Sequence, residues 1–406
     1  MGIRKTLLIR DLALVAVATT ITNVASYLMS LAGARLLPPP EFGAFGALLG
    51  LSIIGSTLAI AAQAVAARRV ASTDPAARDG AAASVIRVAL AAAGMLMLAS
   101  LLVSFPLATL LNVSYVAVAA TLASVAVLIG GFTALGLIQG RSEHARFGGA
   151  YAALGIARAA CTIGAIAVHP SAEAAAIGML AGGTLGSVLA VIVARVPLHI
   201  GPRVLGVSGE LIRNAIALLG LYAITNLDVV LARSLLPVEA SGLYAVGALV
   251  AKIAFFLPTF VSYVLFPHMS STRQSRYRLA SVLATLALGV AVTVASAVLA
   301  PLFISIAGGN RYAGIESSLW LFALQGSIFA VIQSIIYVRM STIDRGSSAI
   351  MTMGVLAFVL LVALRMHNSV DEIVLTSIAV GLATAGVIWR AEFSSSRPRS
   401  SESALR

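Results

Sequence analysis

The chain has 406 residues, of which 60% are hydrophobic and 10% are charged, and its mean hydropathy is +1.01. About a quarter of the residues in soluble domains are charged, so this chain has too few polar side chains to cover a globule of its size, and a soluble protein is excluded. The net charge of +12 would suggest nucleic-acid binding in a soluble protein, but the positions of the charges, described below, indicate membrane orientation instead.

The predicted elements are helices long enough to cross a bilayer. A hydrocarbon core about 30 Å thick needs about 20 apolar helical residues, whereas the strands of a membrane barrel would alternate apolar and polar residues. The third and fourth helices are separated only by Pro106 and a short apolar stretch, so the count could differ by one there. The sequence predicts an all-α polytopic membrane protein with about twelve transmembrane helices, at 12–34, 42–66, 84–105, 114–138, 148–168, 174–194, 214–236, 242–266, 279–306, 318–338, 348–366 and 373–389.

Charges in the loops predict how these helices are oriented. Of the 27 Lys and Arg residues, 21 lie at the termini or in the loops on the N-terminal side. The opposite loops hold Arg35, Arg311 and Arg365. Because cytoplasmic loops carry the excess of positive charge, we expect both termini in the cytoplasm and the protein in the inner (plasma) membrane. This distribution accounts for the net charge without nucleic acid as a partner.

A short motif occurs twice in the loop after the first helix of each predicted half. Turn chemistry alone would account for one copy, because proline stops a helix and glycine often lies beside a helix end. Two copies at an offset of 199 residues, about half the chain, favour a duplication that gives two halves of the same orientation. The first copy is Leu36-Leu37-Pro38 with Glu41, Gly43 and Phe45, and the second is Leu235-Leu236-Pro237 with Glu239, Gly242 and Tyr244.

With its Leu-Leu-Pro, Glu, Gly and aromatic residues, this loop resembles that of the Wzx-type oligosaccharide flippases, which belong with the MATE exporters and lipid II flippases in one superfamily. The stretch from Thr225 to Pro237, with Asn226, Asp228 and Arg233, is similar to the seventh helix of such proteins. The resemblance covers nearly the whole chain and implies a MATE-like fold. We therefore predict an N-terminal six-helix bundle over 1–195, a cytoplasmic linker over 196–213, a C-terminal six-helix bundle over 214–390 and a disordered cytoplasmic tail over 391–406.

Four ionisable residues fall inside the predicted helices: Arg158, Asp228, Arg233 and Lys252. Each charge costs about 2.5–3.5 kcal/mol at the centre of a membrane helix, so we expect all four to face a polar interior. Asp228 and Lys252 lie at similar depths on consecutive helices, so they could form a structural ion pair or one that opens during transport. Arg158 lies near the midplane and favours a cavity role over internal packing. Arg233 is one turn from the surface, where anchoring is favoured over substrate contact.

Neutral polar side chains within the helices could bind sugar hydroxyls or hold neighbouring helices together. They are Asn23, Asn226, Gln63, Gln325 and Gln333. Gly178, Gly182 and Gly186 recur every four residues, which predicts close packing of that helix, and Pro258 and Pro301 inside helices each predict a bend.

No enzyme site is predicted. The five histidines lie in loops or at helix ends without ligand spacing, and the single cysteine, Cys161, excludes both a disulfide framework and a cysteine-based metal site. There is no phosphate-binding Gly-x-x-x-x-Gly-Lys motif, and we expect no cofactor. A membrane glycosyltransferase would need a loop domain or a carboxylate cluster, and the outward loops are too short for such a domain.

Three cations and one carboxylate inside the membrane suit an anionic substrate such as a diphosphate. With the resemblance, this favours a flippase that moves a polyprenyl-diphosphate-linked oligosaccharide to the outer leaflet for cell-surface polysaccharide biosynthesis. Arg158, Lys252 and Arg233 are its candidate substrate-binding residues. Glycosyltransferases and a polymerase of the same pathway are its expected partners, besides the lipid bilayer. A MATE-like cation-coupled exporter of small molecules and a non-transporting scaffold for envelope biosynthesis remain as alternatives.

Cysteine labelling tests the predicted topology. In a Cys161→Ala background, single cysteines at Ser171 and Ser241 should react with an impermeant thiol reagent added outside intact cells, whereas cysteines at Ser142 and Ser275 should not. Labelling of Ser275→Cys from outside would contradict the twelve-helix topology.

Overall fold

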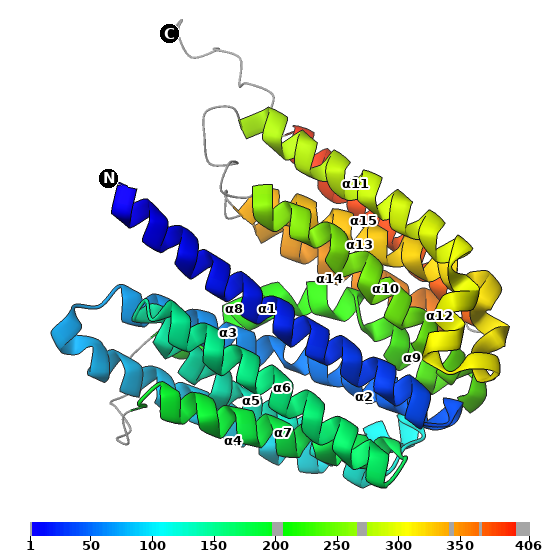
Figure 1. The fold of residues 1–406 in the computed structure, drawn as a ribbon, viewed down its shortest axis with the longest axis horizontal. Coiled ribbons are helices and arrows are strands. Elements are labelled where there is room, and N and C mark those ends of the chain that lie inside the picture. Colours follow the sequence, from blue (N-terminus) through cyan, green and yellow to red (C-terminus); the bar gives the residue numbers. More distant parts are fainter. Residues whose placement is uncertain (1, 197–205, 266–273, 341–344, 365–367, 395–406) are drawn as a thin grey trace, which may run out of the picture. The chain divides into compact units, whose positions relative to one another are not determined.

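The computed structural model describes residues 2–196, 206–265, 274–340, 345–364 and 368–394, and every regular element in these ranges is a helix (Figure 1). The all-α membrane fold is therefore confirmed. The elements are α1 (Gly2–Leu36), α2 (Pro39–Gly55), α3 (Thr57–Ala71), η1 (Pro75–Ala77), α4 (Arg78–Leu111), α5 (Tyr115–Gly140), α6 (His144–Val168), α7 (Ala172–Val193), α8 (Val207–Ile224), α9 (Leu227–Leu235), α10 (Val238–Leu265), α11 (Gln274–Val298), α12 (Ala300–Ala307), η3 (Gly309–Ser318), α13 (Leu319–Met340), α14 (Arg345–Leu364) and α15 (Val370–Ser394).

The predicted count of twelve membrane helices is approximate. Among the described residues, ten helices are long and apolar enough to cross a bilayer, and the bent pair of α11 and α12 brings the number to eleven. The predicted helix at 348–366 corresponds to α14, whose apolar part, Thr352–Leu364, is shorter than the others. Pro106 lies inside α4 and does not end it, so the third and fourth predicted helices meet at the turn after Leu111.

Three predicted helices are interrupted. The helix at 42–66 is divided into α2 and α3 at Ser56, and the helix at 214–236 into α8 and α9 at Thr225 and Asn226. At both breaks a polar side chain bonds to a backbone carbonyl one turn earlier: Ser56 Oγ to Ser52 O (2.7 Å) and Asn226 Nδ2 to Tyr222 O (3.0 Å). Such bonds compete with the backbone ladder of the helix. The third interruption is the 73° bend between α11 and α12, which lies next to Pro301 as predicted. At Pro258, the other predicted bend, α10 continues without an interruption.

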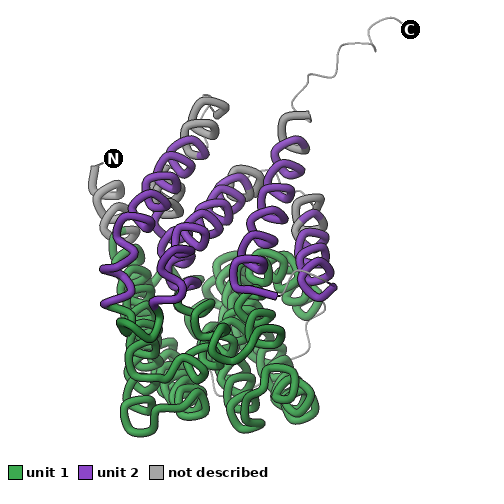
Figure 2. The backbone as a smooth tube through the Cα atoms, turned by 90° about the vertical axis from the view of Figure 1, so that its right-hand side faces the viewer, with its two compact units in different colours: residues 1–246, 306–312 green, residues 247–305, 313–406 purple. Residues whose placement is uncertain are grey.

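The chain forms two compact units, which Figure 2 shows in different colours. Unit 1 consists of Met1–Val246 and Ile306–Tyr312, and unit 2 of Gly247–Ser305 and Ala313–Arg406. Unit 1 therefore contains α1 to α9 and the beginning of α10. The bundles at 1–195 and 214–390 follow the repeat in the sequence, and that division remains a prediction. The predicted linker at 196–213 is described only in part, and the tail at 391–406 lies almost entirely outside the described residues.

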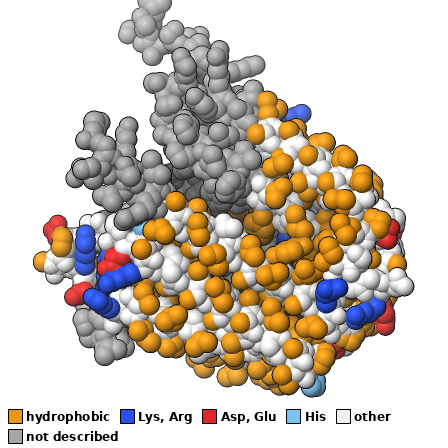
Figure 3. Space-filling model, viewed as in Figure 1, with side chains coloured by type: hydrophobic (Ala, Val, Ile, Leu, Met, Phe, Trp, Pro, Cys, Tyr) orange, Lys and Arg blue, Asp and Glu red, His pale blue; other side chains and the backbone are white. Residues whose placement is uncertain are grey.

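The surface of unit 1 fits a lipid environment. Long apolar side chains of α4, such as Leu98 and Leu102, are largely exposed on the surface. In a water-soluble helix bundle, side chains of this kind would be expected in the core. Figure 3 shows hydrophobic side chains over the middle of the face in view, with charged side chains gathered toward its ends. An apolar band between charged ends is the pattern that a bilayer stabilises.

Glycines bring the helices of unit 1 into backbone contact. A Cβ atom added to Gly178 or Gly186 of α7 would lie 2.6 Å from the Cα of Thr162 or of Leu154 in α6, and one at Gly182 would overlap the backbone of α6 at Ala157. The predicted close packing along this glycine stripe is confirmed. Because lipid tails are as apolar as leucine, close van der Waals packing is a main source of helix association in membranes.

The two copies of the motif have the same local structure and contact each other. In each copy a helix ends just before Leu-Pro and the next begins just after, at Pro39 in α2 and Val238 in α10. A Cβ at Gly43 would lie 2.8 Å from the backbone nitrogen of Gly242, and a Cβ at Gly242 would overlap the carbonyl oxygen of Pro39. The motif glycines therefore allow α2 and α10 to cross with their backbones in contact.

The contact continues along α2. A Cβ at Gly46 would lie 3.0 Å from the Cβ of Ala245 in α10, and one at Gly50 would lie 3.0 Å from the carbonyl oxygen of Asn226 at the α8–α9 break. Gly43, Gly46 and Gly50 share one face of α2, since residues three and four apart lie one above the other on a helix. This glycine face holds α9 and the beginning of α10 in unit 1.

A substitution at the motif glycine tests the importance of this crossing. Gly242→Ala should lower the melting temperature of the purified protein, because the added methyl group meets backbone that cannot rotate away. Gly94→Ala is the matched control: nothing lies within 4 Å of the added Cβ in α4, and alanine favours a helix over glycine. Equal melting temperatures for Gly242→Ala and the wild type would show that the crossing tolerates a wider separation.

Candidate functional site

Arg158 is a charged residue inside a membrane-crossing helix of unit 1. It lies on α6, where its Nη2 donates to Ser52 Oγ of α2 at 2.6 Å and lies 3.5 Å from Met179 Sδ of α7. Its Nε is buried without a hydrogen-bond partner in the described part of the chain, and no described carboxylate forms an ion pair with it. The side chain as a whole is half-buried. Arg158 is therefore a membrane cation whose charge the described residues do not neutralise.

Packing fixes where this guanidinium lies. The backbone of α6 at Arg158 rests against Gly182 of α7, and the two neighbours of the guanidinium, Ser52 and Met179, are both fully buried. A guanidinium has five N–H donors in a planar fork, and a hydroxyl and a thioether supply no negative charge. The remaining donors of Arg158 suit an anion, and a phosphate oxygen pair matches the fork geometry.

A second polar group lies at the α8–α9 break. Asn226 is buried and donates to Tyr222 O and to Thr225 Oγ1, each at 3.0 Å. Asp228, also buried, accepts a hydrogen bond from Tyr244 Oη at 3.0 Å. Tyr244 is the aromatic residue of the second motif copy. The motif residue Tyr244 thus donates a hydrogen bond to Asp228, which lies in the same half of the sequence repeat.

These two polar groups lie on opposite sides of α2. Gly50 faces Asn226, whereas Ser52, two residues later, faces Arg158. Two residues correspond to a rotation of about 200° around an α-helix. The structure thus places Arg158 apart from Asn226 and Asp228, although all three were expected to line one polar interior.

Arg233 joins four segments of unit 1 at one end. Its Nε donates to Leu111 O (2.9 Å) and its Nη2 to Asn112 O (2.9 Å), while Nη1 donates to Pro40 O (2.9 Å) and Ser241 Oγ (3.1 Å). Leu111 and Asn112 form the carboxyl end of α4, where helix carbonyls lack partners and the helix dipole is negative. Arg233 is only 7% exposed. The favoured anchoring role agrees with this geometry, which leaves few donors for a substrate.

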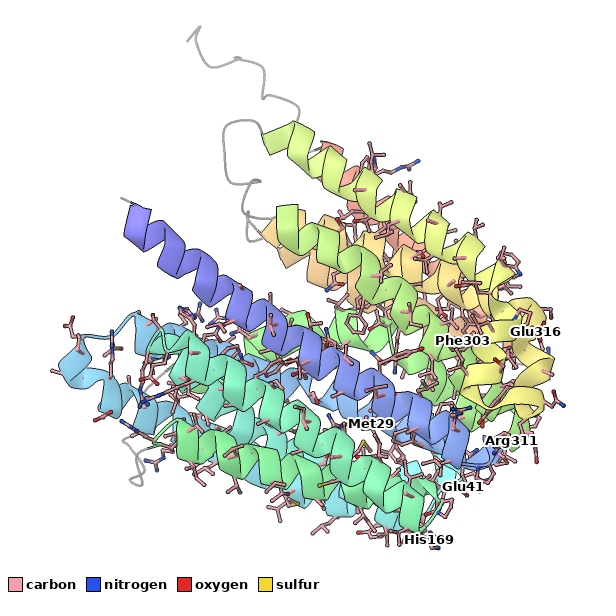
Figure 4. The ribbon with its side chains drawn as sticks, viewed as in Figure 1. Met29, Glu41, His169, Phe303, Arg311 and Glu316 are labelled. Atoms are coloured by element: carbon pink, nitrogen blue, oxygen red, sulfur yellow. The ribbon has the colours of Figure 1, made fainter. Side chains whose placement is uncertain are left out.

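The same end contains a cavity of about 590 Å³. Glu41 and His169, which line it, lie at this end of unit 1 in Figure 4. The cavity's carboxylates already have partners: Glu41 accepts the backbone N–H of Ala172 at 2.7 Å, which caps α7, and Glu173 bonds to Ser114 Oγ. Its polar groups therefore mainly hold the turns of unit 1 together.

Lys252 lies in the part of α10 that belongs to unit 2, and its side chain is half-buried. Asp228 lies in unit 1. Because the two residues belong to different units, the Asp228–Lys252 ion pair remains a prediction, as does convergence of Lys252 and Arg158 on one site.

The neutral polar residues have different surroundings. Gln63 Nε2 donates to Gln139 Oε1 of α5 (3.1 Å), and Gln325 Nε2 donates to Ser377 Oγ of α15 (2.8 Å), so both join neighbouring helices. Gln333 is buried in α13, and Asn23 is exposed on α1. The alternative of interhelical hydrogen bonds therefore describes Gln63 and Gln325 better than a cavity lining.

The sequence analysis did not single out Ser52 and Ser241 as the residues that accept hydrogen bonds from Arg158 and Arg233. Both are small, and nothing in the local pattern marks them, because their role follows from the arginine that reaches them. Ser241 is also buried. A cysteine there will be shielded from reagents, so Ser171 is the better position for reporting this end of the protein.

Comparison with solved structures identifies the fold. The lipid II flippase MurJ in an inward closed conformation superposes with a TM-score of 0.75 at 13% identity, over 94% of this chain and 87% of that one. The chain has the fold of the MOP-superfamily transporters. An inward-facing multidrug resistance MATE transporter of that superfamily gives a TM-score of 0.68 at 11% identity, over 93% and 94% of the two chains. The eukaryotic MATE transporter AtDTX14 gives 0.57 at 14% identity, over 97% and 96%.

No protein-family profile and no curated protein sequence matches the chain. At these identities the structural similarity describes the MOP fold alone. The neighbours themselves are transporters and flippases.

The anchoring role of Arg233 can be tested with the equivalent arginine of the first repeat. Arg233→Lys should lower the melting temperature by several degrees, because an ammonium cannot serve four acceptors that surround a planar fork. Arg35→Lys, at an exposed position at the end of α1, should leave it unchanged. Equal effects of the two substitutions would show that the four hydrogen bonds contribute little.

Proposed function

We propose that this protein is a flippase for a polyprenyl-diphosphate-linked oligosaccharide, with Arg158 as the residue that compensates the diphosphate. The observation that carries this proposal is a half-buried arginine inside a membrane bundle, with a buried Nε and no described carboxylate partner. Leaving such a cation unpaired costs several kcal/mol, so its presence is best accounted for by an anion that binds during function.

The charge pattern favours a flippase over a cation-coupled exporter. Arg158, Arg233 and Lys252 outnumber Asp228, the one acidic residue in the predicted helices. Proton- or sodium-coupled export requires carboxylates that bind and release the coupling ion. In unit 1 the deep cation has hydroxyl and thioether neighbours instead, which suits a ligand that brings its own negative charge.

Similarity to a lipid II flippase supports the same substrate class. That protein gives a TM-score of 0.75 over 94% of this chain, and its substrate, by its name, is a lipid. We place both termini in the cytoplasm of the inner membrane from the distribution of arginine and lysine in the loops. Transport toward the outer leaflet follows from the resemblance to the oligosaccharide flippases.

In this scheme the chain's own residues have separate tasks. Arg158 attracts the diphosphate, and Ser52 holds the guanidinium in place by accepting a hydrogen bond from Nη2. Arg233 and the motif glycines hold the end at which α1–α2 and α9–α10 turn. Release toward that end would require these contacts to open, as alternating access demands. Glycosyltransferases that make the headgroup and a polymerase that uses it are the proposed partners.

A MATE-like exporter is the second candidate. It is favoured by the similarity to an inward-facing multidrug resistance MATE transporter, with a TM-score of 0.68 over 94% of that chain. Susceptibility of cells that lack or overproduce the protein to cationic compounds tests this candidate. Altered resistance with no change in lipid-linked sugars would favour it.

Replacement of Arg158 tests the flippase. Arg158→Gln should reduce flipping by about ten- to a hundredfold, because a hydrogen bond to a charged group contributes about 1.5–3 kcal/mol. Arg158→Lys should retain part of the activity, since the charge remains but the fork is lost. The measurement is leaflet-resolved accumulation of the lipid-linked sugar, normalised to folded protein.

Arg146→Gln is the matched control, because it removes the same charge from an exposed site at the start of α6. Wild-type flipping by Arg158→Gln would contradict the cationic site. Parallel losses of melting temperature and transport in Arg158→Gln and Arg158→Lys would show that Arg158 only packs the bundle.

A further inference from the structure

The end of unit 1 remote from Arg233 contains a second cavity, of about 610 Å³. It lies where α3 ends and where α4 and α8 begin, so residues far apart in the sequence surround it. Its charged residues are Arg68 and Arg69 at the end of α3, and Glu210 and Arg213 in the first turns of α8. The mechanism proposed above uses none of them.

Positive charge exceeds negative charge in this cavity. Arg68 Nη2 and Arg69 Nη2 both pair with the carboxylate of Glu210, the latter at 3.0 Å, and Arg69 Nε donates to the same carboxylate at 3.1 Å. Arg213 is exposed and forms no ion pair within the described part of the chain. Three guanidinium groups against one carboxylate leave two positive charges uncompensated.

The arginines also retain free donors. The Arg68 side chain is 63% exposed although it contacts Glu210, and each guanidinium has five N–H groups. Glu210 fixes the positions of Arg68 and Arg69 from one side, while the open side of the cavity stays accessible. A second anion can therefore bind to an arrangement of donors that is already in place.

The depth of the cavity matches that of lipid headgroups. Three membrane-crossing segments begin or end at its wall: Pro39–Ala71, Pro75–Leu111 and Val207–Ile224. Its guanidinium groups thus lie near the boundary between the apolar band and water. In a bilayer this boundary contains the phosphate groups of the lipids, and basic pockets between helix ends are suited to them.

An apolar face continues from the cavity along α8. Ile212, Ile216 and Leu219 are all largely exposed, and their spacing places them on one face of the helix. Ile212 precedes the cavity residue Arg213, and the face runs from there toward the middle of the span. A molecule with a phosphate in the cavity would find an apolar surface for its chains beside it, which a free phosphate ion does not need.

We propose that the cavity formed by Arg68, Arg69, Glu210 and Arg213 is a binding site for the phosphate headgroup of a membrane lipid, with the lipid chains lying along Ile212, Ile216 and Leu219. The site is separate from Arg158, and binding there does not depend on which substrate the protein transports. Because α3 and α8 come from different halves of the sequence repeat, a lipid bound here joins the two halves at this end.

Binding of short-chain lipids to the full-length protein in detergent tests this proposal, with dioctanoyl phosphatidic acid as the probe. Arg213→Gln and Arg68→Gln should each raise its dissociation constant by about tenfold, the change that corresponds to about 1.4 kcal/mol. Arg146→Gln, which removes an equal charge from an exposed site outside the cavity, should leave it unchanged. Melting temperatures of the same samples show whether the variants are folded. We expect Arg213→Gln to keep the wild-type melting temperature, because Arg213 is exposed.

Two further ligands separate a lipid site from a general anion site. Glycerol 3-phosphate has the phosphate without the chains and should bind at least about tenfold more weakly, because chain contacts contribute about 0.8 kcal/mol per buried methylene. Dioctanoyl phosphatidylcholine has the chains but a zwitterionic headgroup and should also bind more weakly. Equal binding of glycerol 3-phosphate, or an equal loss in Arg146→Gln, would overturn the proposal in favour of a free-anion site or of unspecific charge attraction.

Discussion

The absence of hydrogen-bond partners in lipid is the constraint on which this structure depends. Each backbone N–H and C=O must bond within its own helix, and each charged side chain must face the protein interior or an end. Arg158 turns toward Ser52, Asp228 toward Tyr244, and Arg233 toward the carbonyls that end α4. The same constraint explains why Asn226 satisfies a carbonyl at the α8–α9 break, where the backbone ladder is interrupted. Asn226, Asp228 and Arg233 therefore lie at a helix break or near helix ends, whereas Arg158 lies inside α6 and depends on Ser52 of α2.

Glycines add close backbone contacts to a core in unit 1 that also contains large apolar side chains. Between α6 and α7, and between α2 and the α9–α10 turn, backbones approach so closely that a methyl group would collide. Contacts of this kind are short-ranged and depend on shape, so they hold only where glycines of one helix meet a suitable surface on the next. Residues of the second motif copy pack in this way on α2 and thereby belong to the first compact unit.

The two ends of unit 1 use arginine differently. Arg233 is buried, and its N–H groups donate to backbone carbonyls and to a serine hydroxyl. Its role is therefore structural. Arg68 and Arg213 remain exposed in a cavity with surplus positive charge, which leaves them available to an external anion. Between the ends, Arg158 combines both situations: Ser52 accepts a hydrogen bond from its guanidinium, and none of the carboxylates in the described ranges pairs with it. The number of acceptors around each guanidinium thus distinguishes the anchoring arginine, Arg233, from the arginines that we propose as ligand-binding.

The sequence by itself determined the membrane class, the approximate number and positions of the helices, the glycine packing at Gly178 and Gly186, and the bend next to Pro301. These properties depend on hydropathy and on local backbone chemistry, which are readable along the chain. It did not predict the breaks at Ser56 and Asn226. Serine and asparagine also occur inside continuous helices, and the packing around each position decides whether the helix breaks there. The separation of Arg158 from Asp228 by α2, and the carbonyls at the end of α4 as partners of Arg233, were decided by the tertiary structure alone. Which polar groups meet depends on how helices distant in the sequence are rotated and packed, and the sequence pattern of a single helix carries no information about that rotation when most of its faces are apolar.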